Sequence, residues 1–279
     1  MSYDVVRPFD PWKSELCTCP DKFSFNPYTG CSYRCLYCYA TYIPQFFKLR
    51  KKKDLLKRLK KDLEKLESPL ISMSNSSDPY PPLEKHYRIT RKCIELMKEY
   101  NVRLLIVTKS DIVARDACIL SEIPSAVSVT ITSMTKNPLE PGAPEPVQRI
   151  NALKRLHDAG IPVILRLDPI IPSINDKVVE IVIEKCSFVD HVVSSTLKLR
   201  RDSFNRVVNA LPELRTTFKR LYFENGERIQ NSWYLPTEIR KSLLHRVESK
   251  CKELGISYAF CREGFEFDAR SCDGSYLIS

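Results

Sequence analysis

Short apolar runs rich in β-branched residues alternate along this chain with amphipathic stretches, and this alternation constrains the fold more than any other feature. An apolar run of this length predicts a buried strand, and apolar residues at helical spacing predict a helix. Strands separated by helices indicate βαβ units and a parallel sheet. The expected strands cover residues 23–28, 70–74, 103–108, 126–131, 162–168 and 189–196, and the expected helices lie near 46–66, 87–100, 111–121, 146–159, 175–186 and after 202.

The number of expected strands indicates an open barrel. A closed α/β barrel needs eight strands, and six are found. We therefore expect an α/β fold with an open (β/α)6 partial TIM barrel over residues 23–220. Residues 1–22 form a leader, and residues 221–279 form an extension with one more helix (237–254) and a short strand (256–260). We expect both to pack on one domain.

Polar and hydroxyl-bearing residues follow each expected strand. The chemistry of α/β barrels lies at the carboxyl ends of the strands, where these residues would gather. Such a rim suits a ribose, an amino acid and a polar substrate. The strand-end segments are residues 26–28, 74–78, 108–110, 130–132, 166–169 and 194–196.

The charge balance favours a polyanionic partner. Lysine and arginine number 44 against 34 aspartates and glutamates, which gives a formal net charge of +10. Such an excess favours nucleic acid as a partner without identifying one. Part of it lies on the helix expected within 46–66, whose lysine face either is solvated or contacts phosphate.

The chain has eleven cysteines, a high number for its length. The first residues lack a charged segment followed by an apolar one, and no apolar run approaches the roughly 20 residues that span a membrane. We therefore expect a cytoplasmic protein, in which clustered cysteines indicate metal more often than disulfides. Cys93, Cys118, Cys186 and Cys251 stand alone and are expected to be small packing residues.

Three cysteines stand close together in the loop after the first expected strand. Cys31, Cys35 and Cys38 have C-x3-C-x2-C spacing. Thiolates are the natural ligands of iron–sulfur clusters, and three cysteines satisfy three irons of a [4Fe-4S] cluster. The fourth iron then stays open for a substrate or cofactor. A zinc site is the alternative, although zinc prefers four ligands in two separated pairs, and Cys19 would have to complete the set.

This triplet, with an aromatic residue before its last cysteine, resembles the radical S-adenosylmethionine (SAM) superfamily. The surrounding sequence is most similar to the spore photoproduct lyase-related branch, over nearly the whole chain. The motifs that carry the likeness are residues 26–31, 38–40, 78–84, 108–110, 139–141, 168–172, 261–264 and 272–275.

The resemblance implies a radical enzyme that uses a [4Fe-4S] cluster and SAM. In this superfamily the open iron binds SAM, reductive cleavage gives a 5′-deoxyadenosyl radical, and that radical takes hydrogen from the substrate. By position, Lys109 would hold the SAM carboxylate, and the hydroxyls of Ser76 and Thr130 would lie near SAM. Strand-end position alone adds Asp78 and Arg166; a loop hydrogen bond or helix cap is the alternative for each polar residue. A reducing partner such as a ferredoxin or flavodoxin is also implied.

The candidate catalytic positions are Tyr37, Tyr39 and Asn75. The two tyrosines flank Cys38 as tyrosines do in the lyases. At position 75 the chain departs from the lyase pattern, because the lyases carry there a cysteine that donates a hydrogen atom. An amide does not supply a hydrogen atom as a thiol does, so we do not expect thymine-dimer reversal by that mechanism.

A second metal site is a further hypothesis. Cys17 and Cys19 precede the first strand, and Cys261 and Cys272 lie in the terminal loop. If the two ends of the chain meet, these four thiols could hold an auxiliary iron–sulfur cluster or a zinc ion. The alternatives are structural thiols, or one thiol that acts as the missing hydrogen donor.

Two enzyme functions and one other function follow from these observations. The first is a radical SAM enzyme that repairs or modifies a base of DNA or RNA. The second is a radical SAM enzyme that modifies a protein, a peptide or a small metabolite. The third, of another class, is a non-catalytic iron–sulfur protein.

Overall fold

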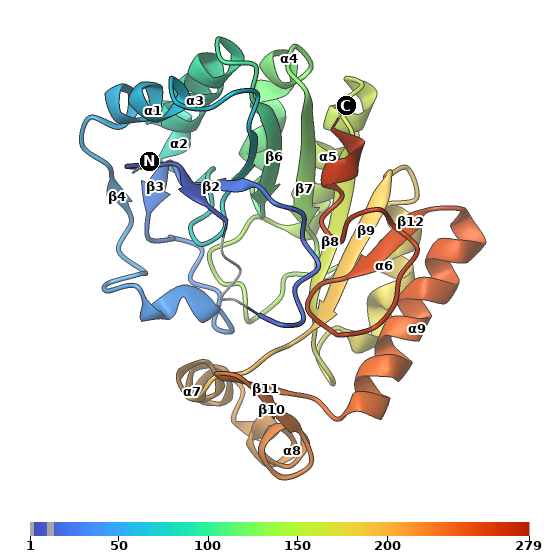
Figure 1. Cartoon of the computed structure of the whole chain (residues 1–279). Helices are drawn as coiled ribbons and strands as arrows, with labels where there is room; N and C mark the ends of the chain where they lie inside the picture. Colours follow the sequence, from blue (N-terminus) through green and yellow to red (C-terminus); the bar gives the residue numbers. More distant parts are fainter. Residues whose placement is uncertain (1–2, 10–13, 279) are drawn as a thin grey trace.

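One mostly parallel sheet forms the centre of the computed structural model, which describes residues 3–9 and 14–278. The strand order is β1-β2-β5-β6-β7-β8-β9-β12 (Figure 1). Every neighbouring pair is parallel except β1 and β2. The strands are β1 (Arg7–Pro8), β2 (Phe23–Phe25), β5 (Leu70–Met73), β6 (Arg103–Thr108), β7 (Ser125–Thr130), β8 (Val163–Ile170), β9 (His191–Thr196) and β12 (Ser257–Phe260).

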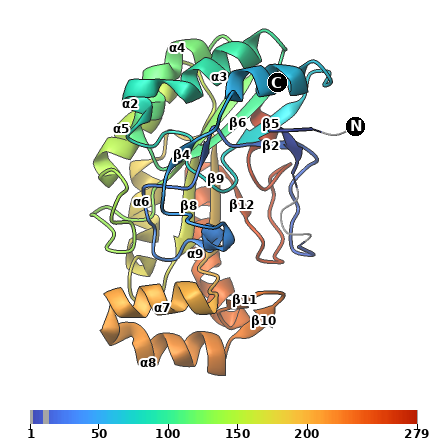
Figure 2. The same cartoon turned by 90° about the vertical axis from the view of Figure 1, so that its left-hand side faces the viewer.

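Helices connect the parallel strands and cover one face of the sheet. Figure 2 shows α5 and α6 on one side of the sheet, and the N-terminal segment and the loop after β12 on the other. The α-helices are α1 (Leu55–Leu63), α2 (Glu84–Tyr87), α3 (Ile89–Lys98), α4 (Ala117–Leu120), α5 (Pro146–Asp158), α6 (Val179–Lys185), α7 (Arg201–Ala210), α8 (Arg215–Phe218) and α9 (Thr237–Leu254). Short 3₁₀ helices span Tyr39–Tyr42, Asp111–Asp116, Asp176–Val178, Pro212–Leu214 and Ser275–Leu277, and a π-helix spans Lys219–Glu224.

The expected open α/β partial barrel is confirmed. In the described chain β1 and β12 are the two edges of the sheet and do not pair with each other. The six expected parallel strands are present, and two more extend the sheet. β1 comes from the leader, and β12, from the C-terminal extension, pairs with β9.

Two cores lie on opposite faces of the sheet. The outer face and the helices share the larger core, which includes Leu104 and Ile106 of β6. The core on the inner face is smaller, and there Leu105 and Ile164 pack against Ile278 of the C-terminal tail. Successive strand residues point to opposite faces, which explains the alternation along β6. The tail therefore fills the inside of the open barrel.

The first expected helix, near 46–66, is wrong over residues 46–54. The helix begins only at Leu55, and Arg50–Lys51 instead form β4, antiparallel to β3 (Tyr28–Thr29). The carbonyl of Phe46 accepts the N–H of Cys31 at 2.7 Å. These residues do not form the helix that their amphipathic pattern predicts, because their backbone groups hydrogen-bond the cysteine loop and β3 instead.

A small subdomain lies beyond the carboxyl ends of the strands. It consists of α7, α8 and the hairpin β10 (Glu227–Ile229) and β11 (Ser232–Tyr234), which lie together in both views (Figures 1 and 2). Leu199, just after β9, pairs with Trp233 of the hairpin. In the described part of the chain, no helix is both long enough and apolar enough to cross a bilayer.

One buried carboxylate ties the N-terminal segment to α1. Oδ2 of Asp62 accepts the backbone N–H groups of Asp4, Val5 and Val6 at 2.9, 2.7 and 3.0 Å. Burial alone would raise the pKa of Asp62, but these three donors hold it below its usual value. These hydrogen bonds hold residues 4–6 against α1.

We expect Asp62→Ala to lower the free energy of unfolding by about 2–3 kcal/mol, because it leaves buried N–H donors without an acceptor. Glu64→Ala, on the exposed face of the same turn, should change it by less than about 0.5 kcal/mol. The carboxylate adds stability above about pH 4, which is lost as the pH falls through its lowered pKa. Urea unfolding between pH 3 and pH 7 measures both effects. Equal losses in the two variants would contradict the anchoring role.

Candidate functional site

The cysteine loop is held between two other backbone segments. The N–H of Leu36 donates to the carbonyl of Leu139 at 2.8 Å, and the N–H of Gly142 to that of Tyr33 at 3.0 Å. Gly30 has a φ of +82°, and a Cβ there would lie 2.5 Å from the carbonyl oxygen of Lys48. Glycine is therefore required where the chain enters the loop.

The structure brings the three cysteines of this loop into one packed group. The backbone N–H groups of Asp78 and Tyr33 lower the pKa of Cys31, and that of Ala40 lowers the pKa of Cys38, against the larger effect of burial. Such donors stabilise a thiolate and tune a bound cluster. Three thiols of one short loop, two of them near backbone N–H donors, form a donor set that fits an iron–sulfur cluster.

Burial raises the pKa of all three thiols, that of Cys31 to about 11. Nearby positive charge opposes this effect. Lys109 lowers the pKa of Cys35, and Arg206 lowers that of Cys38. Binding of iron would supply the remaining positive charge that three buried thiolates require.

A buried carboxylate, Glu140, organises the floor of the loop. It accepts hydrogen bonds from the hydroxyls of Tyr37 and Thr132 at 2.5 and 2.9 Å and from the guanidinium of Arg149 at 2.7 Å. The ammonium of Lys109 lies 3.6 Å from it. Burial would raise the pKa of Glu140, but Lys109 and Arg149 lower it to about 2. Two cations against one anion leave a positive charge beside the cysteines, which suits an anionic group of a cofactor.

Asn75 and Ser76 lie at the start of the β5 loop. The amide nitrogen of Asn75 donates to the hydroxyl of Ser24 at 2.7 Å, and its oxygen accepts the hydroxyl of Ser72 at 3.1 Å. The hydroxyl of Ser76 donates to the side chain of Asn26 at 3.3 Å. The side chain of Asn75 thus bridges β2 and β5.

Asp78 braces the loop after β5 against the end of β6. Its carboxylate accepts the hydroxyl of Thr108 at 2.7 Å and the backbone N–H groups of Lys109 and Tyr80 at 2.8 and 2.9 Å. These bonds occupy both carboxylate oxygens. In this structure Asp78 orders the loop that carries Lys109.

Helix α7 covers the outer side of the cysteine loop. Arg206 donates to the carbonyl of Cys38 at 2.7 Å and to that of Leu36 at 2.9 Å. The hydroxyl of Tyr39 donates to the carbonyl of Asn75 at 2.5 Å. Arg206 was not predicted from the sequence, because an arginine on an amphipathic helix carries no local signal of what it contacts.

A charged group lies at the ends of β8 and β9. Arg166 pairs with Asp168 at 2.8 Å, and the hydroxyl of Ser195 donates to Asp168 at 2.6 Å. Burial would raise the pKa of Asp168, but Arg166, Lys198 and, more weakly, Lys109 hold it below its usual value. The charge of Lys109, just after β6, therefore affects the pKa of Asp168 in β8, on the other side of the rim. Thr130 lies buried at the end of β7 between them.

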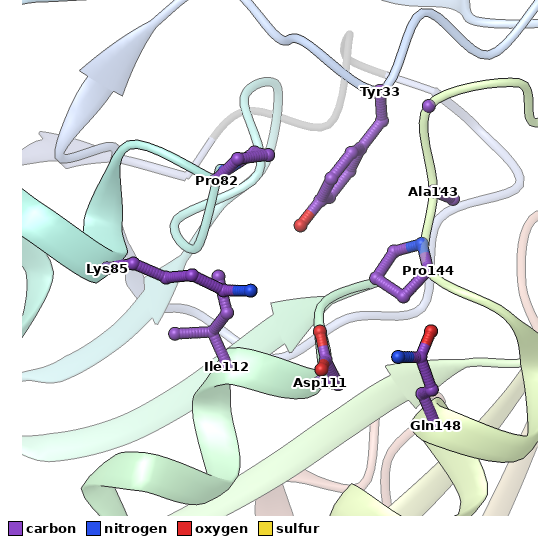
Figure 3. Close-up of a pocket in the computed structure, with 9 residues that line it drawn as sticks. Tyr33, Pro82, Lys85, Asp111, Ile112, Ala143, Pro144 and Gln148 are labelled. Carbon is purple, nitrogen blue, oxygen red and sulfur yellow. The ribbon is translucent and has the colours of Figure 1, made fainter.

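A separate pocket of about 210 Å³ lies behind the cysteine loop. Figure 3 shows Tyr33, Lys85, Asp111 and Gln148 around it. None of the predicted site residues lines this pocket, although Tyr33 and Ala143 in its wall pack against Cys35.

Residues 25–186, more than half of the chain, match the family model described as the radical SAM superfamily. The chain belongs to the radical SAM superfamily. This superfamily uses a [4Fe-4S] cluster and SAM, and the matched residues include the cysteine triplet, Lys109 and Thr130.

Similar proteins occur in archaea and in an archaeal virus. An uncharacterized protein of Methanocaldococcus jannaschii is 35% identical over 163 residues, which cover 56% of this chain and 62% of that protein. An uncharacterized protein of Acidianus two-tailed virus is 27% identical over 173 residues, which cover 54% of this chain and 57% of that protein. The match therefore spans less than two thirds of either relative.

Solved structures confirm the fold. A spore photoproduct lyase complexed with dinucleoside spore photoproduct has a TM-score of 0.67 at 16% identity, over 93% of this chain and 78% of that one. Streptococcus suis SuiB bound to SAM has a TM-score of 0.53 at 11% identity, over 85% of this chain and 49% of that one. At these identities the likeness concerns the fold alone.

The charge network below the radical SAM loop can be tested without any cofactor. We expect Glu140→Gln to cost about 3–5 kcal/mol, because it leaves the buried guanidinium of Arg149 unpaired. The double variant with Arg149→Met should lose less than the sum of the two single losses. The carboxylate stabilises the fold above about pH 4.3, and this part is lost as the pH falls toward its pKa of about 2. Urea unfolding of the four proteins gives the coupling, and additive losses would refute it.

Proposed function

We propose that this protein is a radical SAM enzyme that takes a hydrogen atom from a base of a nucleic acid. Cys31, Cys35 and Cys38 would hold the [4Fe-4S] cluster. When bound, the cluster supplies the electron that cleaves SAM reductively, and the adenosyl radical so formed takes the hydrogen atom. The observation that carries the proposal is the packed group of three cysteines beside the excess positive charge of Lys109 and Arg149.

Residues of the chain would position and shield the cofactor. The ammonium of Lys109 would attract the SAM carboxylate, while Glu140 keeps that ammonium in place at 3.6 Å. Arg206 would hold the loop closed through its bonds to two loop carbonyls. The hydroxyl-bearing residues Thr130 and Ser76 and the pair of Arg166 and Asp168 remain candidates for contacts with SAM and substrate.

Positive charge near the rim supports a nucleic-acid substrate. A pocket of about 240 Å³ is lined by Arg200 and Arg262 together with polar residues of the β10–β11 hairpin. The guanidinium groups of Arg201 in α7 and Arg228 in the hairpin lie 5.8 and 5.2 Å from the ring centre of Trp233. Guanidinium groups bind phosphate, and an aromatic ring offers a surface on which a base stacks. The net charge of +10 points the same way.

The proposal does not include the lyase reaction itself. The spore photoproduct lyase with this fold is complexed with a dinucleoside, and SuiB is bound to a precursor peptide in another structure. In this chain Asn75 stands where the lyases place their donor thiol, and its amide is bonded to Ser24 and Ser72. If nucleic acid does not bind, the alternative function is modification of a peptide or a metabolite.

We expect the anaerobically reconstituted and reduced protein to convert SAM to 5′-deoxyadenosine. Cys35→Ala should abolish the product, whereas Cys118→Ala, at an exposed isolated cysteine, should retain it. Lys109→Ala should weaken SAM binding roughly 10-fold or more, because a charge-assisted hydrogen bond is lost. Chromatography of the product and equilibrium binding measure these effects. Intact SAM in a sample with four irons per chain would reject the proposal.

We expect single-stranded DNA or RNA oligonucleotides to bind with an affinity that falls steeply as KCl rises from 50 to 300 mM. Arg262→Ala should reduce the slope of log K against log salt by about 1, because one phosphate contact is lost. Lys57→Ala, on the exposed face of α1, should leave the slope unchanged if that face is only solvated. Fluorescence anisotropy gives the slopes. Binding that is absent or insensitive to salt would exclude nucleic acid and favour a peptide or metabolite substrate.

A further inference from the structure

The two ends of the chain meet, and they bring four cysteines together. The sulfurs of Cys19 and Cys272 are 3.2 Å apart although 253 residues separate them in sequence. The thiol of Cys17 is hydrogen-bonded to the sulfur of Cys19, and Cys261 lies close enough to raise the pKa of Cys17. We call these four residues the thiol group.

The thiol group lies on the open side of the barrel. Cys17 and Cys19 come just before β2, and Cys261 and Cys272 follow β12, at opposite ends of the sheet. In Figure 1 the blue segment before β2 and the dark red loop after β12 approach each other there. A buried ion pair between Lys22 and Asp273 joins the same two segments.

The thiol group differs from the isolated cysteines of the chain. Cys93, Cys186 and Cys251 are fully buried in the main apolar core. Cys17, Cys19 and Cys261 are only partly buried, and none of the four belongs to that core. Small apolar packing therefore explains Cys93, Cys186 and Cys251 but not the thiol group. The packing role predicted for Cys118 is wrong, because that residue is exposed.

The surroundings of Cys19 suit a metal-bound thiolate. The thiols of Cys17 and Cys272 and the ammonium of Lys22 all lie near its sulfur. A thiolate is the form that binds metal.

We propose that Cys17, Cys19, Cys261 and Cys272 bind one zinc ion, which closes the open side of the barrel. Four thiolates form a tetrahedral structural zinc site with bonds of about 2.3 Å, which sets neighbouring sulfurs about 3.8 Å apart. The observed 3.2 Å between two of them is close to that spacing. In a [4Fe-4S] cluster each cysteine binds a different iron, so its sulfurs lie much farther apart.

Zinc binding would draw the four thiols around one centre, which they do not yet surround. Within residues 3–9 and 14–278, no three His, Cys, Asp or Glu side chains are already placed around a single ion. Rotation about one Cα–Cβ bond moves a cysteine sulfur, so the thiols reach a common centre by changes of rotamer. The thiols give up their protons as the ion binds.

The zinc ion would also support the catalytic rim. Cys261 is hydrogen-bonded to the guanidinium of Arg166, and its carbonyl accepts the ammonium of Lys198 at 3.2 Å. Holding Cys261 therefore fixes one wall of the rim where Arg166 meets Asp168. A zinc-bound thiolate carries no S–H hydrogen, so this proposal excludes a hydrogen-donor role for the thiol group.

The test uses the full chain with Cys31, Cys35 and Cys38 all changed to alanine, so that no cluster forms on the loop. Elemental analysis of this protein after purification should find one zinc per chain. Cys19→Ser with Cys272→Ser should remove it, whereas Cys186→Ser with Cys251→Ser should keep it. Because this background does not cleave SAM, the result is independent of the proposed function.

Two further measurements guard against a variant that fails to fold. Cys17→His should keep the zinc, since histidine is also a zinc ligand, whereas Cys17→Ala should lose it. Replacement by cobalt should give thiolate-to-cobalt charge-transfer absorption in the same background. Removal of zinc from this background by a chelator should lower Tm by more than about 5 °C. Absence of bound zinc in the background protein, or iron and sulfide in its place, would overturn the proposal.

Discussion

The whole arrangement depends on the fact that the sheet does not close. An open barrel leaves the inner face of its strands and two strand edges without partners, and both must be covered. The C-terminal tail covers the inner face, where Ile278 packs against residues of β6 and β8. Lys22 and Asp273 join the segments on either side of the opening. The tail contacts these strands at Leu105 and Ile164, on the amino-terminal side of the strand ends that form the candidate site.

Charge is balanced below the cysteine loop in a way that suits a cofactor. Burial disfavours thiolates, and the pKa of each loop cysteine is raised. Lys109 and Arg206 oppose this effect without cancelling it, so the loop is incomplete without further positive charge. Glu140 in turn keeps Lys109 and Arg149 from repelling each other. The same network therefore holds the loop in shape and, in the proposed function, would present the ammonium of Lys109 to the anionic end of SAM.

Elements whose pattern is local could be predicted from the sequence, and contacts between distant segments could not. The strand at residues 103–108 and the helix at 237–254 match the structure because their periodicity agrees with their packing. Residues 46–54 also carry an amphipathic pattern, but pairing with the cysteine loop overrides it. The sequence singled out Glu140 only as part of a motif and did not single out Arg149. The residues next to them in sequence do not indicate that the two side chains are buried together as an ion pair. The sequence predicted that Cys19 and Cys272 would meet only if the two ends of the chain came together. No local pattern shows where two distant chain segments lie relative to each other.

Position 75 shows how far the likeness to the lyases extends. A side chain there lies at the carboxyl end of β5, next to the first strand of the open edge. In this chain its amide donates to Ser24 of β2 and accepts from Ser72 of β5, so it joins these two strands. A thiol is only a weak donor and a weak acceptor, so it would form these two bonds poorly. The fold is thus shared with the lyases. At position 75, where the resemblance predicts their hydrogen donor, this chain has an amide that bridges β2 and β5. The substrate must therefore be argued from charge at the rim instead of from kinship.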